Sequence, residues 1–274
     1  MPTAAVNDTV LHVESDGAGP PWVVIHGGLG VDHVIYRRTL GPLTDACQVV
    51  FFDQRGNGRS GPVDLATVTM EQLADDVAVL ADTLGLDRFS VLGHSYGGFV
   101  AQEFALRHPD RLERLVLVDT SPGGLGASES PDDEQGPPPP DELLKLLAVP
   151  PASDDEMAAM MQRLLPFYFP KTDPERVAPL FDGTVFRAGV LRRGFEVLSQ
   201  WSSVDRLEAI TAPTLLVVGR HDVFTSVPQS FRIGRRIPDA TTVVLEHSGH
   251  FPWIEEPDAF FAALGDWVAG KPST

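Results

Sequence analysis

Short, continuous apolar runs alternate along the chain with longer segments in which apolar residues recur at intervals of three and four. Continuous runs are typical of strands that are buried on both faces, and the longer spacing is typical of helices that bury one side. We predict strands at 22–25, 48–52, 88–92, 115–118, 214–218 and 241–245, and the clearest helices at 70–84, 98–108, 227–236 and 257–268. Strands that alternate with helices, without an internal repeat, predict an α/β fold with a mostly parallel central sheet and helices on both faces.

This alternation breaks between residues 122 and 206. Ser121 to Pro140 is rich in proline, glycine and acidic residues, a composition that favours an extended, solvated segment. The residues that follow predict only helices, at 141–148, 154–165, 175–181 and 189–201. We therefore expect an α/β core formed by residues 1–121 and 207–274, with residues 122–206 inserted as a helical cap behind a Pro-rich acidic entry linker. The alternative is a set of surface helices that do not act as a lid.

The composition is that of an ordinary globular protein with a surplus of acidic residues. Of the 274 residues, 43% are hydrophobic and 22% are charged, so the chain can bury a large core. The formal charge of −17 disfavours nucleic acids and anionic membranes as partners, since both bind basic surfaces. No apolar run approaches the ~18 residues of a membrane span, and the N-terminus lacks the basic and apolar regions of a signal peptide. We expect a cytoplasmic protein that acts on a small molecule, with a homodimer as a candidate assembly.

Little in the chain points to redox or metal chemistry. The single cysteine, Cys47, precedes a predicted strand, and we expect a buried, inert thiol that forms no disulfide within the chain. The histidines and acidic residues show no ligand spacing such as His-x-x-x-His with a partner, so we predict no metal. The glycines at 27, 28 and 30 lack the Gly-x-Gly-x-x-Gly spacing of a dinucleotide site, and we predict no cofactor.

The pentapeptide Gly93-His94-Ser95-Tyr96-Gly97 lies between a predicted strand and a predicted helix. A sharp turn at that junction would lift Ser95 out on strained backbone, where the two glycines have no side chains to collide. The first turn of the helix would offer free N–H groups and a positive dipole end to a developing anion. We interpret the motif as a nucleophile elbow with Ser95 as the candidate nucleophile; the alternative is a plain glycine-rich turn.

A serine hydroxyl needs a base to accept its proton and an acid to orient that base. Asp222 directly follows one predicted strand, and His250 lies in the loop after the next one. Because loops at the carboxyl ends of parallel strands meet at one edge of a sheet, we expect Ser95, Asp222 and His250 to converge there. Asp119, at the end of another strand, is the rival for the acid, and His247 is the rival for the base.

Taken together, these elements resemble the α/β-hydrolase superfamily with a serine nucleophile and a helical cap. The resemblance is carried, in chain order, by His26-Gly27-Gly28, the loop 53–60, the elbow, Gly219-Arg220-His221-Asp222 and Ser248-Gly249-His250. It implies that Ser95 attacks an acyl carbon, that His250 carries the proton, and that Asp222 orients the imidazole. It also implies an oxyanion hole formed by the backbone N–H groups of Tyr96 and Gly28, with Leu29 as a weaker candidate.

Several polar residues near these motifs are expected to support the site rather than react. His26 and His94 flank it, and we expect neither to carry protons. We expect Asp53 and Arg55 to tie neighbouring loops together by hydrogen bonds. Dehalogenases and epoxide hydrolases resemble the chain elsewhere but carry aspartate at the nucleophile position, so Ser95 argues against both.

The sequence says less about the substrate. Residues 52–60 and 249–257 are similar to the prolyl aminopeptidase branch, but esterases and lactonases share these scaffold loops. An aminopeptidase also needs acids in its cap, where Asp182, Glu196 and Asp205 are candidates. The cap aromatics, some of which we expect above Ser95, are Phe167, Tyr168, Phe169, Phe181, Phe186, Phe195 and Trp201.

An apolar pocket above Ser95 favours hydrolysis of a small, fairly hydrophobic carboxylic ester or lactone, including acyl-homoserine lactones. Three alternatives stay open: a prolyl aminopeptidase-like peptidase, a C–C bond hydrolase with the same triad, and a non-catalytic ligand-binding protein that retains the fold.

Overall fold

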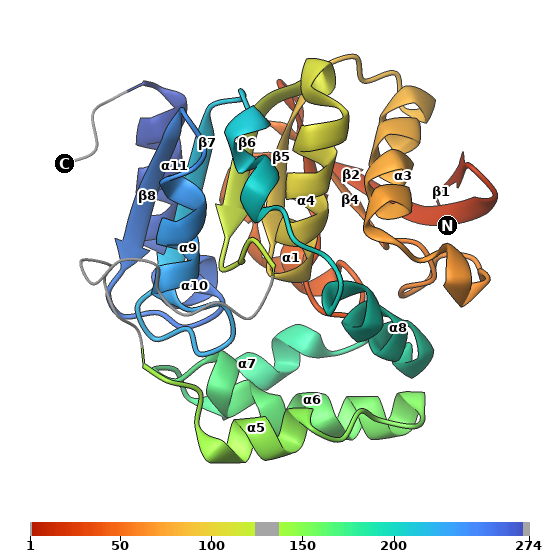
Figure 1. Cartoon of the computed structure of the whole chain (residues 1–274), viewed down its shortest axis with the longest axis vertical. Coiled ribbons are helices and arrows are strands. Elements are labelled where there is room, and N and C mark those ends of the chain that lie inside the picture. Colours follow the sequence, from red (N-terminus) through yellow and green to blue (C-terminus); the bar gives the residue numbers. More distant parts are fainter. Residues whose placement is uncertain (1, 124–136, 271–274) are drawn as a thin grey trace.

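The computed structural model describes residues 2–123 and 137–270, which are organised around one eight-stranded sheet (Figure 1). The strand order is β1-β2-β4-β3-β5-β6-β7-β8, in which the β1-β2 and β2-β4 pairs are antiparallel and every other pair is parallel. The strands are β1 (Thr3–Val6), β2 (Thr9–Asp16), β3 (Pro21–Ile25), β4 (Gln48–Phe52), β5 (Phe89–His94), β6 (Leu112–Val118), β7 (Thr214–Gly219) and β8 (Ala240–Leu245). The predicted α/β class and mostly parallel sheet are confirmed.

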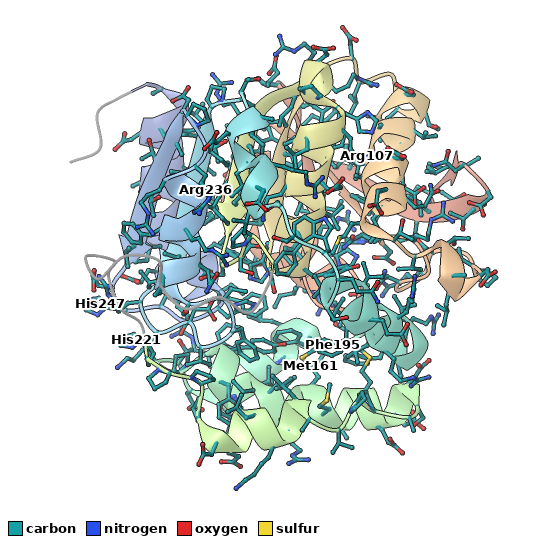
Figure 2. The ribbon with its side chains drawn as sticks, viewed as in Figure 1. Arg107, Met161, Phe195, His221, Arg236 and His247 are labelled. Carbon is teal, nitrogen blue, oxygen red and sulfur yellow. The ribbon has the colours of Figure 1, made fainter. Side chains whose placement is uncertain are left out.

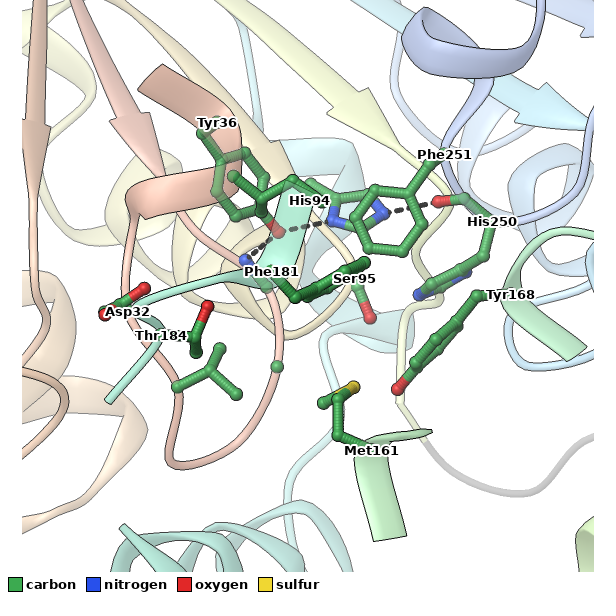
Figure 3. Close-up of a pocket in the computed structure, with 14 residues that line it drawn as sticks. Asp32, Tyr36, His94, Ser95, Met161, Tyr168, Phe181, Thr184, His250 and Phe251 are labelled. Atoms are coloured by element: carbon green, nitrogen blue, oxygen red, sulfur yellow. Dashed lines mark hydrogen bonds between the residues drawn. The ribbon is translucent and has the colours of Figure 1, made fainter. Parts of the chain in front are cut away.

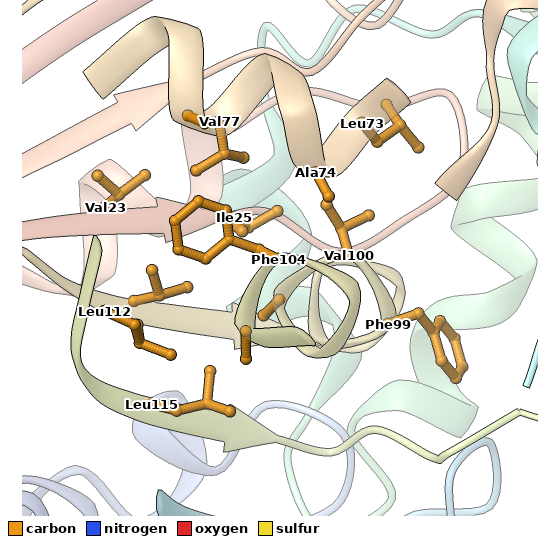
Figure 4. Packing of buried hydrophobic residues seen from close by; sticks show 14 of the residues in the cluster. Val23, Ile25, Leu73, Ala74, Val77, Phe99, Val100, Phe104, Leu112 and Leu115 are labelled. Carbon is orange, nitrogen blue, oxygen red and sulfur yellow. The ribbon is translucent and has the colours of Figure 1, made fainter. Parts of the chain in front are cut away.

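Helices cover both faces of this sheet. The first face carries α3 (Met70–Thr83), α4 (Tyr96–Arg107) and α9 (Val227–Gly234), and the second carries α1 (Val34–Thr39), α2 (Gly41–Thr44), α10 (Pro252–Glu255) and α11 (Pro257–Val268). Side chains alternate between the two faces along each strand. In β3, Val23 and Ile25 pack with the α3 and α4 residues drawn in Figure 4, whereas Trp22 and Val24 join the cluster on the second face. This two-sided burial explains why the strands read as continuous apolar runs.

Helix α3 shows how the local sequence sets an element. Thr69 caps it, since its hydroxyl accepts a hydrogen bond from the backbone N–H of Gln72 at 3.2 Å. Its buried residues include Leu73 and Val77, which recur with the helical period, and Gly85 follows its end with a φ of 71°. Burial of each such aliphatic side chain contributes roughly 1.5–3 kcal/mol to stability.

Three local features go beyond the predicted elements. The segment from Val34 forms two short helices, α1 and α2, because Pro42 has no N–H with which to continue the first one. Helix α6 (Asp154–Tyr168) runs past its expected end through Pro166, and the burial of Leu165 and Phe169 on either side of this proline stabilises the added turn. The four-residue helix α10 is too short to give a periodic signal.

Residues 137–198 form helices α5 (Asp141–Leu147), α6, α7 (Pro174–Val177) and α8 (Ala188–Leu198). Figure 1 shows α5, α6 and α7 as a layer below the lower edge of the sheet, with α8 beside them. Most of the expected entry linker falls in 124–136, outside the described residues. In the part of the chain that is described, no helix has the length and apolar character needed to cross a bilayer.

The expected place of Trp201 among the cap aromatics was wrong. Its ring lies 5.6 Å from that of Phe99, and its Nε1–H donates to a carboxylate oxygen of Glu103 at 2.9 Å, so it packs against α4 of the core. The chain returns to the core directly after α8, where Ser202 pairs with Gly123 in an isolated bridge. The apolar spacing predicted a helix up to Trp201, so it did not indicate that the chain rejoins the core after Leu198.

Candidate active site

Ser95 lies between β5 and α4 in a conformation that few non-glycine residues adopt. Its φ is 52° and its ψ is −118°. Such backbone costs about 1–3 kcal/mol and persists only where the surroundings hold it. Here the N–H of Ser95 donates to the carbonyl of Val118 at 3.0 Å, and its carbonyl accepts from the Thr120 hydroxyl at 2.9 Å. The structure therefore places Ser95 on the sharp turn that the motif predicts.

The two glycines of the motif are explained by close backbone contacts. A Cβ on Gly97 would lie 2.0 Å from the carbonyl oxygen of Ile25, at the end of β3. A Cβ on Gly93 would lie 2.6 Å from the Cβ of Ala101 on α4. Since no side chain fits either gap, the glycines let α4 begin directly against the sheet, with Ser95 at the junction.

Asp222 occupies the loop after β7 and is completely buried. One of its oxygens accepts the N–H of Phe224 at 2.8 Å, and the other accepts the hydroxyl of Thr225 at 2.6 Å. Burial alone would raise the pKa of Asp222, but the neighbouring charge of His250 and the hydrogen bonds from Thr225 and Phe224 lower it to about 2. Asp222 is therefore an oriented anion at neutral pH.

His250 is held beside Asp222 and against the helical layer. Its Nδ1 lies 3.1 Å from Oδ2 of Asp222, but the N–H direction is too bent for a well-aligned hydrogen bond. Its ring stacks on Tyr168 at 5.3 Å and lies 5.1 Å from the ring of Phe224. A small rotation of the imidazole would straighten the contact, and such bonds commonly tighten only when substrate is bound.

A chain of hydrogen bonds runs behind Ser95 (Figure 3). The N–H of Gly27 donates to the Tyr36 hydroxyl at 2.6 Å, that hydroxyl lies 2.7 Å from Nδ1 of His94, and Nε2 of His94 lies 2.7 Å from the carbonyl oxygen of His250. Because a carbonyl can only accept, Nε2 carries the proton of His94, and the Tyr36 hydroxyl donates to Nδ1. Burial lowers the pKa of His94 well below its usual value, so the ring is neutral.

This chain joins the glycine-rich loop, the elbow and the loop of His250. The supporting role expected for His94 agrees with its contacts, whereas sequence reasoning missed Tyr36. A tyrosine in an amphipathic segment gives no sign that its hydroxyl reaches a histidine 58 positions away.

Asp119 is the second buried carboxyl group at this centre. One oxygen accepts the N–H of Gly219 at 2.9 Å, and the other has no hydrogen-bond partner among the described residues. Burial and the neighbouring charge of Asp222 raise the pKa of Asp119 well above its usual range. Burial therefore disfavours the charged form of Asp119, and Asp222 is the carboxylate that contacts His250.

A narrow cavity opens over Ser95; the space between its lining residues, together with the solvent at its mouth, amounts to about 410 Å³. Figure 3 shows the Ser95 hydroxyl pointing into it beside the His250 ring, with Met161 opposite. Gly28 also lines it, with a φ of 74° that a side chain would not tolerate. The lining comprises Gly27, Gly28, Val31, Asp32, Ile35, Tyr36, His94, Ser95, Met161, Tyr168, Phe181, Thr184, His250 and Phe251.

The rival and supporting residues lie elsewhere. His247 is exposed and is drawn with His221 at the edge of the molecule in Figure 2. Asp182, Glu196 and Asp205 are also exposed, and none of them lines the cavity. Arg55 is buried and donates to Asp76 of α3 at 2.7 Å and to Asp8 of the turn between β1 and β2 at 2.7 Å, so it ties its loop to a helix as well as to a turn.

Two groups of described residues have the spacing to hold a metal ion. The first is Asp119, Asp222 and His250, but the oxygens of Asp222 are already engaged by Thr225 and Phe224. The second, His12 with Glu14 and His33, lies outside the cavity lining.

Glu255 of α10 fixes the loop that carries His250. It accepts the N–H of Gly249 at 2.6 Å and the hydroxyl of Thr172 at 3.3 Å, which also links α10 to the turn after α6. Burial raises the pKa of Glu255 to about 7, against the opposing effect of these hydrogen bonds and with a smaller contribution from neighbouring Glu256. The folded protein therefore favours the protonated carboxyl group.

Comparisons with known proteins agree with this geometry. A family model described as alpha/beta hydrolase fold matches residues 20–257. The chain is 28% identical over 249 residues to a putative carbamate hydrolase RutD of Caulobacter sp. (strain K31), covering 91% of each chain. It is 30% identical over 269 residues to the 2-hydroxy-6-oxo-6-phenylhexa-2,4-dienoate hydrolase of Comamonas testosteroni, covering 93% of this chain and 90% of that one.

Among solved structures, the chain is similar to the enol-lactonase from Burkholderia xenovorans LB400. The TM-score is 0.79 at 29% identity, and the match covers 98% of this chain and 100% of that one. The three relatives are named for hydrolysis of different bonds, so what they share is the fold and the reaction class.

Replacing the elbow glycine tests the close contact with β3. Gly97→Ala should lower the free energy of unfolding by about 1–3 kcal/mol or more, because the new methyl group overlaps the Ile25 carbonyl. The matched control is Gly265→Ala on α11, where a Cβ meets nothing within 4 Å and should raise stability by about 0.5–1 kcal/mol. Urea unfolding measures both. Equal effects of the two substitutions would contradict the close contact.

The raised pKa of Glu255 predicts a pH dependence of stability. The folded state binds more protons than the unfolded state between pH 4.5 and about 7, so Glu255 makes stability fall as pH rises through this window. Urea unfolding of Glu255→Gln should show a smaller fall than the wild type.

The control for this prediction is Glu246→Gln, at an exposed carboxylate whose pKa is lowered by its hydrogen bond to Arg220. The contribution of Glu246 to the free energy of unfolding should stay constant across the same pH window. A Glu255→Gln profile parallel to that of the wild type would show that Glu255 titrates normally.

Proposed function

The chain belongs to the α/β-hydrolase family and is a hydrolase, and we propose that it is a serine hydrolase that cleaves a small, uncharged, fairly hydrophobic carboxylic ester or lactone through an acyl-enzyme intermediate. The observation that carries the proposal is Ser95 itself. It is a strained residue with a φ of 52° that opens into a cavity beside buried His250, whose Nδ1 lies 3.1 Å from anionic Asp222.

In this mechanism Ser95 Oγ attacks the acyl carbon while Nε2 of His250 takes its proton. The tetrahedral intermediate collapses when His250 returns the proton to the leaving alcohol, and water then releases the acid by the same steps. Asp222 holds the tautomer with hydrogen on Nδ1 and stabilises the imidazolium. The ionised state of Asp222 and its bonds to Thr225 and Phe224 support this role.

The oxyanion of the intermediate would be bound by two backbone N–H groups. Tyr96 is the first residue of α4, so its N–H has no partner within the helix, and the helix dipole adds positive potential there. Gly28 lines the cavity next to Ser95 and supplies the second donor. Loss of one such donor typically lowers turnover by about 100- to 1000-fold.

The charges around the cavity favour an uncharged acyl group. Among the fourteen lining residues, all within the described ranges, there is no lysine or arginine that could bind a substrate carboxylate. The one lining carboxylate, Asp32, is bound by Arg59 at 2.8 Å and by the N–H of Val185 at 2.8 Å, so it does not offer a free anion. Apolar and aromatic side chains make up most of the remaining wall.

We further propose that the helical part of the expected cap, from α5 to α8 (residues 141–198), sets substrate size. Met161 and Tyr168 of α6, together with Phe181 and Thr184 of the segment after α7, line the cavity over Ser95. Tyr168 also stacks on the ring of His250, so movement of this segment would alter both the pocket and the base.

The alternatives fit the cavity less well. A prolyl aminopeptidase needs an anion for the substrate amine, yet Asp182, Glu196 and Asp205 lie outside the lining. A C–C bond hydrolase is the second candidate, favoured by 30% identity to the enzyme of Comamonas testosteroni. The dienoate named for that enzyme is an anion, and no lining cation meets it here. A non-catalytic binding protein would not need the strain at Ser95.

Isosteric amides distinguish the two buried carboxyl groups. Asp222→Asn should lower kcat by about 10,000-fold, because an amide favours the wrong imidazole tautomer and cannot stabilise the cation. Asp119→Asn should change kcat by less than about tenfold, since Asp119 bonds to the N–H of Gly219, burial disfavours its charge, and Asp222 is the acid paired with His250. Steady-state kinetics on one active ester measure both. A larger loss at position 119 would make Asp119 the acid.

A substrate panel tests the proposed reaction. The wild type, Ser95→Ala and the control Cys47→Ala would be assayed on p-nitrophenyl esters of increasing chain length, homoserine lactones, proline β-naphthylamide and a dienoate C–C substrate. We expect turnover of short esters or lactones by the wild type and Cys47→Ala, and none by Ser95→Ala. Preference for the proline amide or the dienoate would replace the proposed substrate class, and full activity of Ser95→Ala would exclude the nucleophile.

A further inference from the structure

Two histidines and a glutamate converge on β2, outside the active-site cavity. His12 and Glu14 are two residues apart on the strand, so both side chains project from the same face, and His33 directly precedes α1. Nε2 of His12 lies 3.4 Å from one carboxylate oxygen of Glu14, and Nε2 of His33 lies 3.7 Å from the other. One nitrogen or oxygen atom from each of the three residues lies within 4.8 Å of the others.

Asp53 orients one of these histidines as a ligand. The Nδ1 of His33 lies 2.6 Å from Oδ1 of Asp53, which also accepts the backbone N–H of His33 at 3.0 Å. A carboxylate oxygen accepts hydrogen bonds, so this contact orients the ring with Nδ1 toward Asp53 and Nε2 toward Glu14. Metal-bound histidines commonly have such a carboxylate behind them.

The surroundings of the three side chains carry an excess of negative charge. Among the described residues, the carboxylates of Glu14, Asp16, Asp32 and Asp53 are contacted by only two guanidinium groups, those of Arg37 and Arg59. Counting carboxylates and guanidinium groups alone, four face two, a difference that one divalent cation would balance. Arg37 contacts Glu14 but also forms bonds of 2.6 and 3.0 Å to Asp16, so it can remain on Asp16 if Glu14 turns.

We propose that His12, Glu14 and His33 bind a structural divalent transition-metal ion, with Zn²⁺ as the best match. Imidazole nitrogen and carboxylate oxygen suit this ion, and tetrahedral bonds of about 2.0–2.2 Å place neighbouring ligand atoms about 3.4 Å apart. The two Nε2-to-oxygen distances, 3.4 and 3.7 Å, run to different oxygens of Glu14, so the carboxylate would bind through both oxygens or turn to offer one oxygen between the two histidines. The Glu14 side chain is 24% exposed, so solvent can reach the site and supply a fourth ligand.

The ion would join β2 to the loop that lines the active site. His33 is the neighbour of Asp32, and Asp32 lines the cavity with Gly28. None of the three ligands lines the cavity, so the ion takes no part in hydrolysis. Its expected effect is to stabilise the fold, and the inference does not depend on the proposed substrate.

Metal binding by the full chain tests the proposal directly. Protein stripped with a chelator would be titrated with Zn²⁺ by calorimetry and melted with and without the ion. We expect one ion per chain, a Tm raised by several degrees, and tetrahedral d–d bands when Co²⁺ is used. X-ray absorption at the zinc edge should show two imidazole ligands with oxygen ligands, a measurement that needs no variant.

Three variants place the ion. His12→Gln and Glu14→Gln should each abolish binding of the one Zn²⁺ ion per chain, and added Zn²⁺ should no longer raise the Tm of either variant. His247→Gln is the matched control, because this exposed histidine lies outside the cluster and near His221, where adventitious zinc could bind. Absence of a stoichiometric ion in the wild type would overturn the proposal. The proposal would also be overturned if His12→Gln and Glu14→Gln bound Zn²⁺ as the wild type does. The same holds if only His247→Gln lost Zn²⁺ binding.

Discussion

The site depends on the contact between the first turn of α4 and the end of β3. The backbones approach so closely there that a single methyl group on Gly97 would overlap the carbonyl oxygen of Ile25. A helix that starts this close to the sheet leaves no room for a gradual turn, so the strain falls on Ser95. The same contact places the free N–H end of α4 beside the glycine-rich loop that follows β3. One packing constraint thus exposes the nucleophile and brings both proposed oxyanion donors near it.

Buried hydrogen bonds then hold the loops that this contact brings together. His94 reaches the hydroxyl of Tyr36 on one side and the carbonyl of His250 on the other, and Tyr36 in turn holds Gly27. Every donor in this chain has one acceptor, so breaking a bond would leave a buried polar group unpaired at a cost of about 1–3 kcal/mol. The reactive groups lie on loops, yet these bonds fix them to the sheet.

Much of this arrangement could be predicted from the sequence. The apolar runs predicted the strands, because both faces of the sheet are covered, and Gly93 and Gly97 predicted the sharp turn at Ser95. The convergence of Asp222 and His250 on this turn followed from strand ends meeting at one edge. That convergence is a matter of geometry, and the catalytic roles remain proposals.

Other features depend on contacts between distant residues, which one sequence does not reveal. Examples are the hydroxyl of Tyr36 on His94, the raised pKa of Asp119, and the packing of Trp201 on α4. The cluster of His12, Glu14 and His33 escaped notice for the same reason. Its members are brought together by β2 and α1, and their spacing along the chain matches no ligand motif.

The most direct test of the account is covalent labelling of the folded protein with a fluorophosphonate, followed by peptide mapping by mass spectrometry. We expect one adduct per chain, located on Ser95, with much slower labelling when His250 is replaced by alanine, because the base would no longer activate the hydroxyl. A folded protein that remains unlabelled, or an adduct on any other residue, would contradict the claim that Ser95 is an activated nucleophile.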